Sequence, residues 1–333
     1  MFVSPTGTFD NGAEISIYHL MSYLQKNGYK VVNVAPKSTM NNQTDYMKRF
    51  SDIGIDVHLI PTIKWWWEDA PGGIAGLPEQ RAASFRDSIN QIIHIINAYH
   101  VDFVITNTVN MYEGMVAAAC TEIPHYTLIH EFPEGEFAYY LDKIDFVEEN
   151  SDRIFSVDGQ LKNVLTQKFV NSDVGGFTPY TELKTSVLKK GNQHRIVSVG
   201  RLTERKNQLE LLYAFQKLTS NSMYKDIELV FIGPWDSEYK KLCDSYINEY
   251  NLRNIIFCGE QKNPWSLVTD KDICVFPSAL ETYGLVYVES ILNGIPTIFS
   301  DNPGHLSAYQ RFEFGTLYPL GNIDVLVNSI ENQ

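Results

Sequence analysis

The chain has 333 residues, of which 44% are hydrophobic, and a formal net charge of −13 at pH 7. This length is too great for one ordinary domain and predicts two domains of roughly 150 to 180 residues. The acidic charge argues against nucleic-acid binding, and no apolar run reaches the roughly 18 to 20 residues of a membrane-spanning helix.

The first half of the chain alternates short β-rich runs with helical periodicity. A strand is expected at residues 1–3, followed by a loop at 4–13 and a helix at 14–27 that Gly28 ends. Further strands are predicted at 30–35, 103–106, 126–129 and 153–157, with helical stretches between them. Such alternation predicts a parallel, doubly wound sheet.

The second half restarts the same scheme. A strand at 195–199 precedes a helix that Asn207 caps and that runs through Leu218, and the last helix is expected at 323–330. The other strands are predicted at 228–232, 255–258, 273–276, 297–300 and 316–318. We therefore expect an α/β protein with two Rossmann-like doubly wound domains, residues 1–175 and 190–333, joined near 171–192 and facing each other across a cleft. Ligands of such sheets bind beyond the carboxyl ends of the strands.

The run PSALETYGLVYVESILNG, residues 277–294, is the most informative segment. Pro277 ends a buried strand, Glu281 lies in the following loop, and Glu289 lies in the first turns of a helix that Gly294 ends. Unpaired backbone N–H groups at the start of this helix form an anion site. The two carboxylates cannot hold a phosphate, but they can accept hydrogen bonds from the hydroxyls that flank the diphosphate of a nucleotide-sugar.

A basic loop, SVGRLTERKN at residues 198–207, follows the first strand of the second half. Gly200 permits a tight exit from the strand, and Arg201 and Lys206 then stand above the sheet. Two cations there can neutralise a diphosphate and stabilise the charge on a leaving nucleotide. The other interpretation is a solvated basic loop, which is our expectation for Arg205 beside Glu204.

Together, GRLTERKN and FPSALETYGLVYVE resemble the donor-binding half of retaining GT-B glycosyltransferases of the large family 4 type. The resemblance covers residues 195–304. In the first half it is weaker and includes the loop near Gly12, TLIHEF at 127–132, and the strand at 153–157.

The resemblance implies that Arg201 and Lys206 grip the donor diphosphate, that Glu281 contacts the transferred sugar, and that Glu289 contacts the ribose. Backbone N–H groups facing the sugar and phosphates would come from Tyr283, Gly284 and Leu285. It also implies a donor that is a nucleoside-diphosphate sugar, most often of UDP, with no cofactor and no metal, because the cations and a helix N-terminus replace a divalent ion. The reaction would retain the anomeric configuration without a nucleophilic residue.

In the first half, similarity to the family's glycine-rich loop places Gly12 close to the diphosphate. Any tight turn between strand and helix would also use Gly7 and Gly12. Glu14 is either a favourable carboxylate at a helix N-terminus or an acceptor contact. His130 follows a buried strand and should emerge at the cleft edge, where the resemblance implies contact with the donor sugar; Glu131 could serve the acceptor.

Three consecutive indoles, Trp65 to Trp67, cannot all face one core. They either anchor a loop to the first domain, or at least one of them contacts an acceptor sugar or a lipid. Residues 107–113 and 132–140 are further candidates for acceptor-side loops.

The leading hypothesis is a glycosyltransferase of the hexosyltransferase class that modifies a polysaccharide, glycan or lipid-linked acceptor. A nucleotide-sugar epimerase and a non-catalytic glycosyltransferase-like partner subunit remain open. The four cysteines lack metal-like spacing and the N-terminus lacks a leader pattern, so we expect a cytoplasmic protein, with peripheral contact at the inner face of the plasma membrane left open. Two departures from the family bear on domain closure: a very short first strand, and little chain after 330 for the family's crossing helix.

Overall fold

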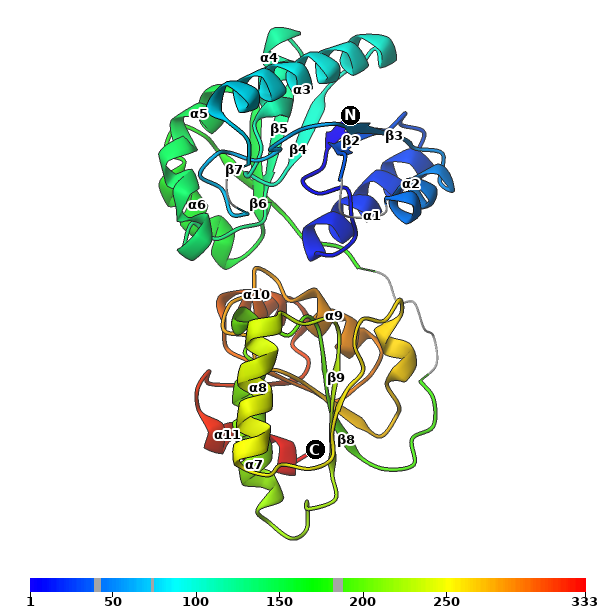
Figure 1. Cartoon of the computed structure of the whole chain (residues 1–333), viewed down its shortest axis with the longest axis vertical. Helices are drawn as coiled ribbons and strands as arrows, with labels where there is room; N and C mark the ends of the chain where they lie inside the picture. The colour runs from blue at the N-terminus through cyan, green and yellow to red at the C-terminus, as the bar shows by residue number, and fades with distance from the viewer. Residues whose placement is uncertain (39–42, 73–74, 182–187) are drawn as a thin grey trace. The chain divides into compact units, whose positions relative to one another are not determined.

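The computed structural model describes residues 1–38, 43–72, 75–181 and 188–333. These residues form two compact units, Met1–Tyr180 and Thr181–Gln333, called here the first and second unit. Each unit is a parallel sheet with helices on both faces (Figure 1). The predicted α/β class with two doubly wound sheets is therefore confirmed.

The first unit contains a seven-stranded sheet in the order β3-β2-β1-β4-β5-β6-β7, and every neighbouring pair is parallel. Its strands are β1 (Phe2–Val3), β2 (Val32–Pro36), β3 (Asp56–Ile60), β4 (Val104–Asn107), β5 (His125–Ile129), β6 (Arg153–Val157) and β7 (Val174–Phe177). Its helices are α1 (Gly12–Lys26), α2 (Thr44–Ser51), α3 (Pro78–Tyr99), α4 (Glu113–Cys120), the 3-10 helix η1 (Gly135–Lys143), α5 (Ile144–Glu149) and α6 (Gln160–Lys168).

The short strand β1 shows how this sheet is buried on both faces. Phe2 packs with Ile17 of α1 and Phe50 of α2, whereas Val3 packs with Ile92 of α3 and other residues on the opposite face. Successive side chains of a strand point to opposite faces, so a strand covered on both sides is mostly apolar on both. This is why even two residues suffice to seat β1 between β2 and β4.

The second unit repeats the design with six parallel strands in the order β10-β9-β8-β11-β12-β13. The strands are β8 (Arg195–Val199), β9 (Glu228–Ile232), β10 (Ile255–Phe257), β11 (Asp272–Phe276), β12 (Thr297–Ser300) and β13 (Thr316–Tyr318). The helices are η2 (Glu204–Lys206), α7 (Gln208–Thr219), α8 (Ser237–Glu249), η3 (Pro264–Leu267), α9 (Leu285–Leu292), α10 (Pro303–Phe312) and α11 (Ile323–Glu331).

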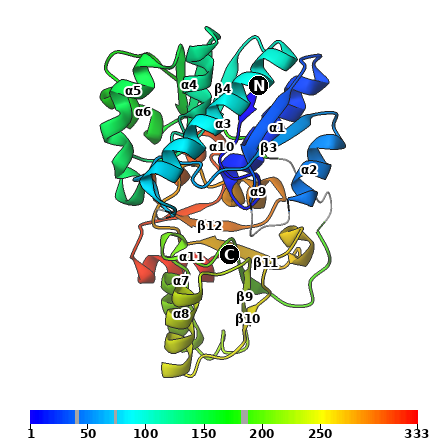
Figure 2. The ribbon, with the colours of Figure 1, turned by 45° about the horizontal axis from the view of Figure 1, so that its top comes forward.

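Helices α7, α8 and α11 cover one face of the second sheet and lie side by side (Figures 1 and 2). In β12, Ile298 packs into this helical layer, while the neighbouring Phe299 stacks on Tyr287 of α9 and approaches Tyr309 of α10. The alternation places α9 and α10 on the opposite face, where they begin at the carboxyl edge of the sheet.

Strand order reverses at one point in each sheet, between β1 and β4 and between β8 and β11. At such a switch point the loops after the two central strands diverge to opposite faces and leave room for a ligand. The loops concerned follow Val3, Asn107, Val199 and Phe276.

Two strands were not predicted from the sequence. Strand β3 carries Asp56 and His58 and is only partly buried, and β7 contains Gly175 and Gly176, whose missing side chains leave no alternating pattern. Among the described residues, no helix is long and apolar enough to cross a bilayer.

Candidate active site

The switch point of the second sheet brings together the two segments that the sequence analysis singled out. The loop after β8 contains η2, which ends at Lys206, and the loop after β11 contains Glu281 and leads into α9. Close backbone packing fixes both loops. A side chain at Gly233 would lie 2.1 Å from the carbonyl oxygen of Gly200, and one at Gly304 would lie 2.2 Å from that of Glu281.

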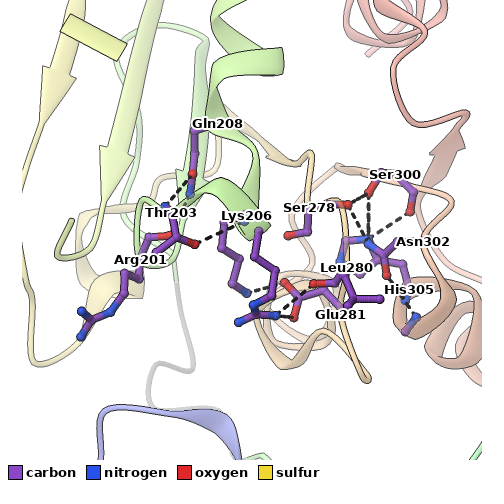
Figure 3. Close-up of polar contacts among 12 residues, drawn as sticks. Arg201, Thr203, Lys206, Gln208, Ser278, Leu280, Glu281, Ser300, Asn302 and His305 are labelled. Carbon is purple, nitrogen blue, oxygen red and sulfur yellow. Dashed lines mark hydrogen bonds and ion pairs between the residues drawn. The ribbon is translucent and has the colours of Figure 1, made fainter. Parts of the chain in front are cut away.

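A three-residue ion pair forms at the centre of this site (Figure 3). The Lys206 ammonium is 2.5 Å from Oε1 of Glu281, and the Arg205 guanidinium is 3.0 Å from Oε2. Arg205 also donates to the carbonyl of Leu280 at 3.0 Å. The Glu281 side chain is 7% exposed, that of Lys206 16% and that of Arg205 52%. The structure thus joins residues 75 positions apart in the sequence.

These charges hold Glu281 in its ionised form. Burial alone would raise the pKa of Glu281, but the positive charges of Lys206 and Arg205 outweigh burial and lower it to about 2. An ionised carboxylate only accepts hydrogen bonds. At neutral pH Glu281 can therefore accept from sugar hydroxyls but cannot act as a proton donor.

Of the two arginines of the basic loop, Arg205 differs from expectation. Arg205 was predicted to be solvated. This was only partly correct: its guanidinium is exposed, but it is also bonded to Glu281. Arg201 is exposed, and Figure 3 shows its side chain directed away from Lys206 and Glu281. Its carbonyl accepts from Gln208 at 3.0 Å, which ties the loop to α7. Its predicted contact with a diphosphate stays a prediction.

Glu289 lies about one turn along α9 from the start of that helix, and both of its carboxylate oxygens have partners. Oε1 accepts from the Thr181 hydroxyl at 2.6 Å, and Oε2 accepts from the Trp265 indole at 2.7 Å. Sequence reasoning missed Trp265, which is a single buried aromatic in η3 without any surrounding motif. A ribose at Glu289 would have to share or replace these donors.

The start of α9 supplies backbone donors. Gly284 is the N-cap residue with φ of 79°, a left-handed conformation that glycine adopts without strain. Leu285 and Val286 are the first two helical positions, so no carbonyl within the helix accepts their N–H groups. Tyr283, the other predicted contributor, is buried beside them. The partial positive charge of these groups adds to that of Lys206.

His305 supports this helix start and was also missed. A side chain at Gly284 would lie 2.6 Å from its ring, and its Nδ1 is 3.0 Å from the Ser300 carbonyl and 2.8 Å from the Asn302 amide (Figure 3). Burial lowers the pKa of His305 to about 4, although the Glu281 charge opposes the shift. His305 is therefore neutral at pH 7. No sequence motif marked it, because its contacts come from separate loops.

In the first unit, the glycine-containing loop after β1 is closed by Glu14. Gly12 is the first residue of α1, and the buried Glu14 accepts from the Thr6 N–H at 2.9 Å, the Thr6 hydroxyl at 2.6 Å and the Gly7 N–H at 3.2 Å. Burial raises the pKa of Glu14 to about 7 in spite of these donors. Glu14 also lies in the first turn of α1, the position of the helix N-terminal carboxylate that was one of the two roles considered, and its contact with an acceptor stays a prediction.

His130 follows β5, as predicted, but its side chain is buried, with 9% of the residue exposed. Its Nε2 is 2.7 Å from Oδ1 of Asn107, and burial lowers its pKa to about 3. Burial also raises the pKa of the adjacent Glu131 to about 7, against the effect of backbone donors that include the His130 N–H at 3.1 Å. A donor contact by His130 stays a prediction.

The sequence comparisons match this chain to sugar-transferring enzymes. Residues 180–332 match the family described as "Glycosyl transferases group 1". Over 93 residues the chain is 34% identical to the capsular polysaccharide biosynthesis glycosyltransferase CapH of Staphylococcus aureus, covering 28% of this chain and 26% of that protein.

Over 129 residues it is 28% identical to the N-acetylgalactosamine-N,N'-diacetylbacillosaminyl-diphospho-undecaprenol 4-alpha-N-acetylgalactosaminyltransferase of Campylobacter jejuni, covering 38% of this chain and 33% of that protein. The matched region thus spans about one quarter to one third of the length of these relatives.

The fold comparison covers nearly the whole chain. The crystal structure of Anabaena HepE in complex with UDP matches with a TM-score of 0.75, 16% identity, and coverage of 99% of this chain and 88% of that chain. At this identity the likeness shows the fold, which is of the GT-B kind. Residues 180–332, a little under half of the chain, thus match the group 1 glycosyl transferase family, which is the family that the sequence resembles.

Proposed function

We propose that the chain is a retaining glycosyltransferase that moves a hexose-type sugar from a nucleoside-diphosphate sugar to a glycan or lipid-linked acceptor. The observation that carries this proposal is the cluster of Lys206, Arg205 and Glu281 at the start of α9. It combines positive charge, unpaired backbone donors and an ionised hydroxyl acceptor, which are the groups that a diphosphate and its adjoining sugar need.

In this proposal the diphosphate is held by the Lys206 ammonium, by Arg201 and by the N–H groups of Leu285 and Val286. Negative charge grows on the leaving phosphate as the bond to the anomeric carbon breaks. Fixed positive groups lower the energy of that state, as a divalent ion would. Glu281 accepts from the sugar hydroxyls, and Glu289 contacts the ribose after exchanging one of its present donors.

The proton balance requires no nucleophilic residue. The acceptor hydroxyl forms a bond to the anomeric carbon on the face that the phosphate leaves, and its proton passes to an oxygen of that phosphate. A UDP-sugar is the proposed donor, supported by UDP in the matched HepE structure. A lipid-linked acceptor is supported by the name of the Campylobacter jejuni relative, and action would then take place in the cytoplasm at the membrane surface.

Thermal denaturation with UDP-, GDP- and ADP-sugars tests the donor proposal, because a ligand that binds the native state raises its midpoint. We expect a UDP-sugar to raise the midpoint of the wild-type chain more than it raises that of Lys206→Ala. Incubation with donor alone should give slow hydrolysis. Epimerised sugar would instead identify an epimerase, and no shift with any of the donors would contradict the proposal.

A further inference from the structure

Loops at the carboxyl ends of the strands are fixed in both units by side chains from other segments. In the first unit, the indole N–H groups of Trp65 to Trp67 donate to the carbonyls of Ser4, Pro5 and Val109, in the loops after β1 and β4. These tryptophans therefore anchor loops, as one of the two interpretations predicted. In the second unit, a polar network around Glu210 does the same for the basic loop at 198–207.

Glu210 is buried in the first turn of α7, and its two carboxylate oxygens bind two separate loops. Oε2 accepts from the side-chain amide of Asn207 at 2.5 Å, at the end of the basic loop. Oε1 accepts from the Gly321 N–H at 2.9 Å, in the loop between β13 and α11. Glu210 thus ties the end of the basic loop to a part of the unit 111 positions away in the sequence.

Asn207 forms the bend at which η2 ends and α7 begins. Its φ of 54° and ψ of 36° are left-handed, a conformation that asparagine adopts more readily than most residues with a side chain. Its N–H donates to the carbonyls of Thr203 at 3.0 Å and Glu204 at 3.1 Å, and its side chain is held by Glu210. Both the backbone and the side chain of the bend are therefore fixed.

This bend fixes the residue before it, Lys206. The Lys206 N–H donates to the carbonyl of Thr203 at 3.0 Å, and its ammonium bonds Glu281 at 2.5 Å. On the other side, the carbonyl of Arg205 accepts from the Ala279 N–H at 2.8 Å, in the loop after β11. Because a lysine side chain is long and flexible, its ammonium is placed accurately only when the backbone that carries it is held.

We propose that Glu210 is a positioning residue of the donor site: through Asn207 it holds the backbone of Lys206 so that the ammonium reaches Glu281 and the donor diphosphate. The alternative is a cap of α7 alone, since a carboxylate in the first turn stabilises a helix start. A cap would contribute to stability without affecting the Lys206–Glu281 pair. The part that concerns the diphosphate rests on the proposed function; the part that concerns the Lys206–Glu281 pair does not.

A double-mutant cycle tests the proposal without any ligand. Lys206→Met, Glu281→Gln and their combination give the coupling between Lys206 and Glu281 in urea denaturation. We expect this coupling to be smaller in a Glu210→Gln background than in the wild type, because glutamine offers one acceptor oxygen where the carboxylate offers two. Asn207→Asp should also reduce it, since two carboxylates then face each other.

The exchange Asn207→Asp/Glu210→Gln should restore the coupling. The glutamine amide can then donate to the aspartate while its oxygen accepts from the Gly321 N–H. The matched control is Asn322→Ala, which removes the cap of α11 next to Gly321, where the Asn322 side chain accepts from the Val325 N–H at 3.1 Å. It should destabilise the chain and leave the coupling unchanged.

Calorimetric titration with UDP tests the part that concerns the donor. Glu210→Gln should bind UDP about tenfold more weakly than the wild type, the effect of losing one charge-assisted hydrogen bond from Lys206. Asn322→Ala and the exchange variant should bind UDP as the wild type does. In a Lys206→Met background, Glu210→Gln should cause no further loss, because its effect acts through the ammonium.

Equal coupling in Glu210→Gln and in the wild type would overturn the proposal, as would a loss of coupling that Asn322→Ala reproduces. A wild type that binds UDP and a Glu210→Gln variant that binds it equally well would also overturn it. Absence of UDP binding by the wild type would contradict the proposed function. Reduced coupling in Glu210→Gln and its return in the exchange variant would, even then, support the role of Glu210 in placing Lys206.

Discussion

Replacing Lys206 by methionine removes the ammonium and keeps the length of the side chain. The pKa of Glu281 falls from its ordinary 4.5 to about 2 in the folded chain. At about 1.4 kcal/mol per unit, the ionised carboxylate gains roughly 3 kcal/mol of stability from its surroundings. Because this pKa is lowered, the contribution is complete above pH 4.5 and is lost as the pH falls toward 2.

Lys206 supplies the larger share of this contribution, since the Arg205 side chain is 52% exposed and its charge is screened by solvent. We expect Lys206→Met to lower the free energy of unfolding by about 2 kcal/mol at pH 7, because a buried carboxylate keeps only its weaker partner. We also expect turnover to fall by about 100-fold or more, the typical effect of removing a group that stabilises transition-state charge.

Urea denaturation at pH 7, with a glycosyl-transfer assay on the same samples, measures both effects. The double variant Lys206→Met/Glu281→Gln should regain most of the lost stability, because the buried charge is gone, yet stay inactive. The control Lys217→Met breaks an exposed pair with Asp324 and should change stability by less than about 0.5 kcal/mol. Wild-type stability and turnover in Lys206→Met would show that the ammonium neither stabilises the ionised Glu281 nor takes part in transfer.

Three further predictions concern neighbouring groups. Arg201→Ala should leave the urea midpoint within error of the wild type, because the Arg201 side chain is exposed. It should, however, reduce the stabilisation by UDP-sugar. Equal stabilisation of the variant and the wild type would show that Arg201 does not contact the donor. Trp265→Phe should cost about 1–3 kcal/mol in urea denaturation, because Glu289 loses a 2.7 Å donor, and an unchanged midpoint would show that this bond contributes nothing. Because the pKa of Glu14 is raised to about 7, the wild type should lose up to roughly 3 kcal/mol of unfolding free energy as the pH increases from about 4.5 to 7. Glu14→Gln should remove this loss. The same pH dependence of unfolding free energy in both chains would contradict this.

The fold class could be predicted because both sheets are buried on two faces. Strands such as Val104–Asn107 and Asp272–Phe276 are fully buried, and buried parallel strands give short apolar runs that the sequence displays directly. Strand Val174–Phe177 gave no such signal. It is an edge strand with two glycines, and its place in the sheet depends on pairing with β6 rather than on its own pattern.

The site was predictable only where a local motif carried it. Glu281 and Lys206 lie in recognisable segments, and the structure brings these two side chains together. The roles of Trp265 and His305 depend on contacts with residues more than twenty positions away, which no single segment encodes. The bond of Arg205 was missed for a related reason. The polar sequence around Arg205 predicts an exposed side chain, but it does not predict the bond to Glu281.

A crystal structure of the chain with a bound UDP-sugar would test the proposed donor site directly. We predict diphosphate oxygens within hydrogen-bond distance of the Lys206 ammonium and of the Leu285 and Val286 N–H groups, with a sugar hydroxyl donating to Glu281. A nucleotide-sugar bound elsewhere, with the Lys206–Glu281 pair intact and untouched, would contradict it.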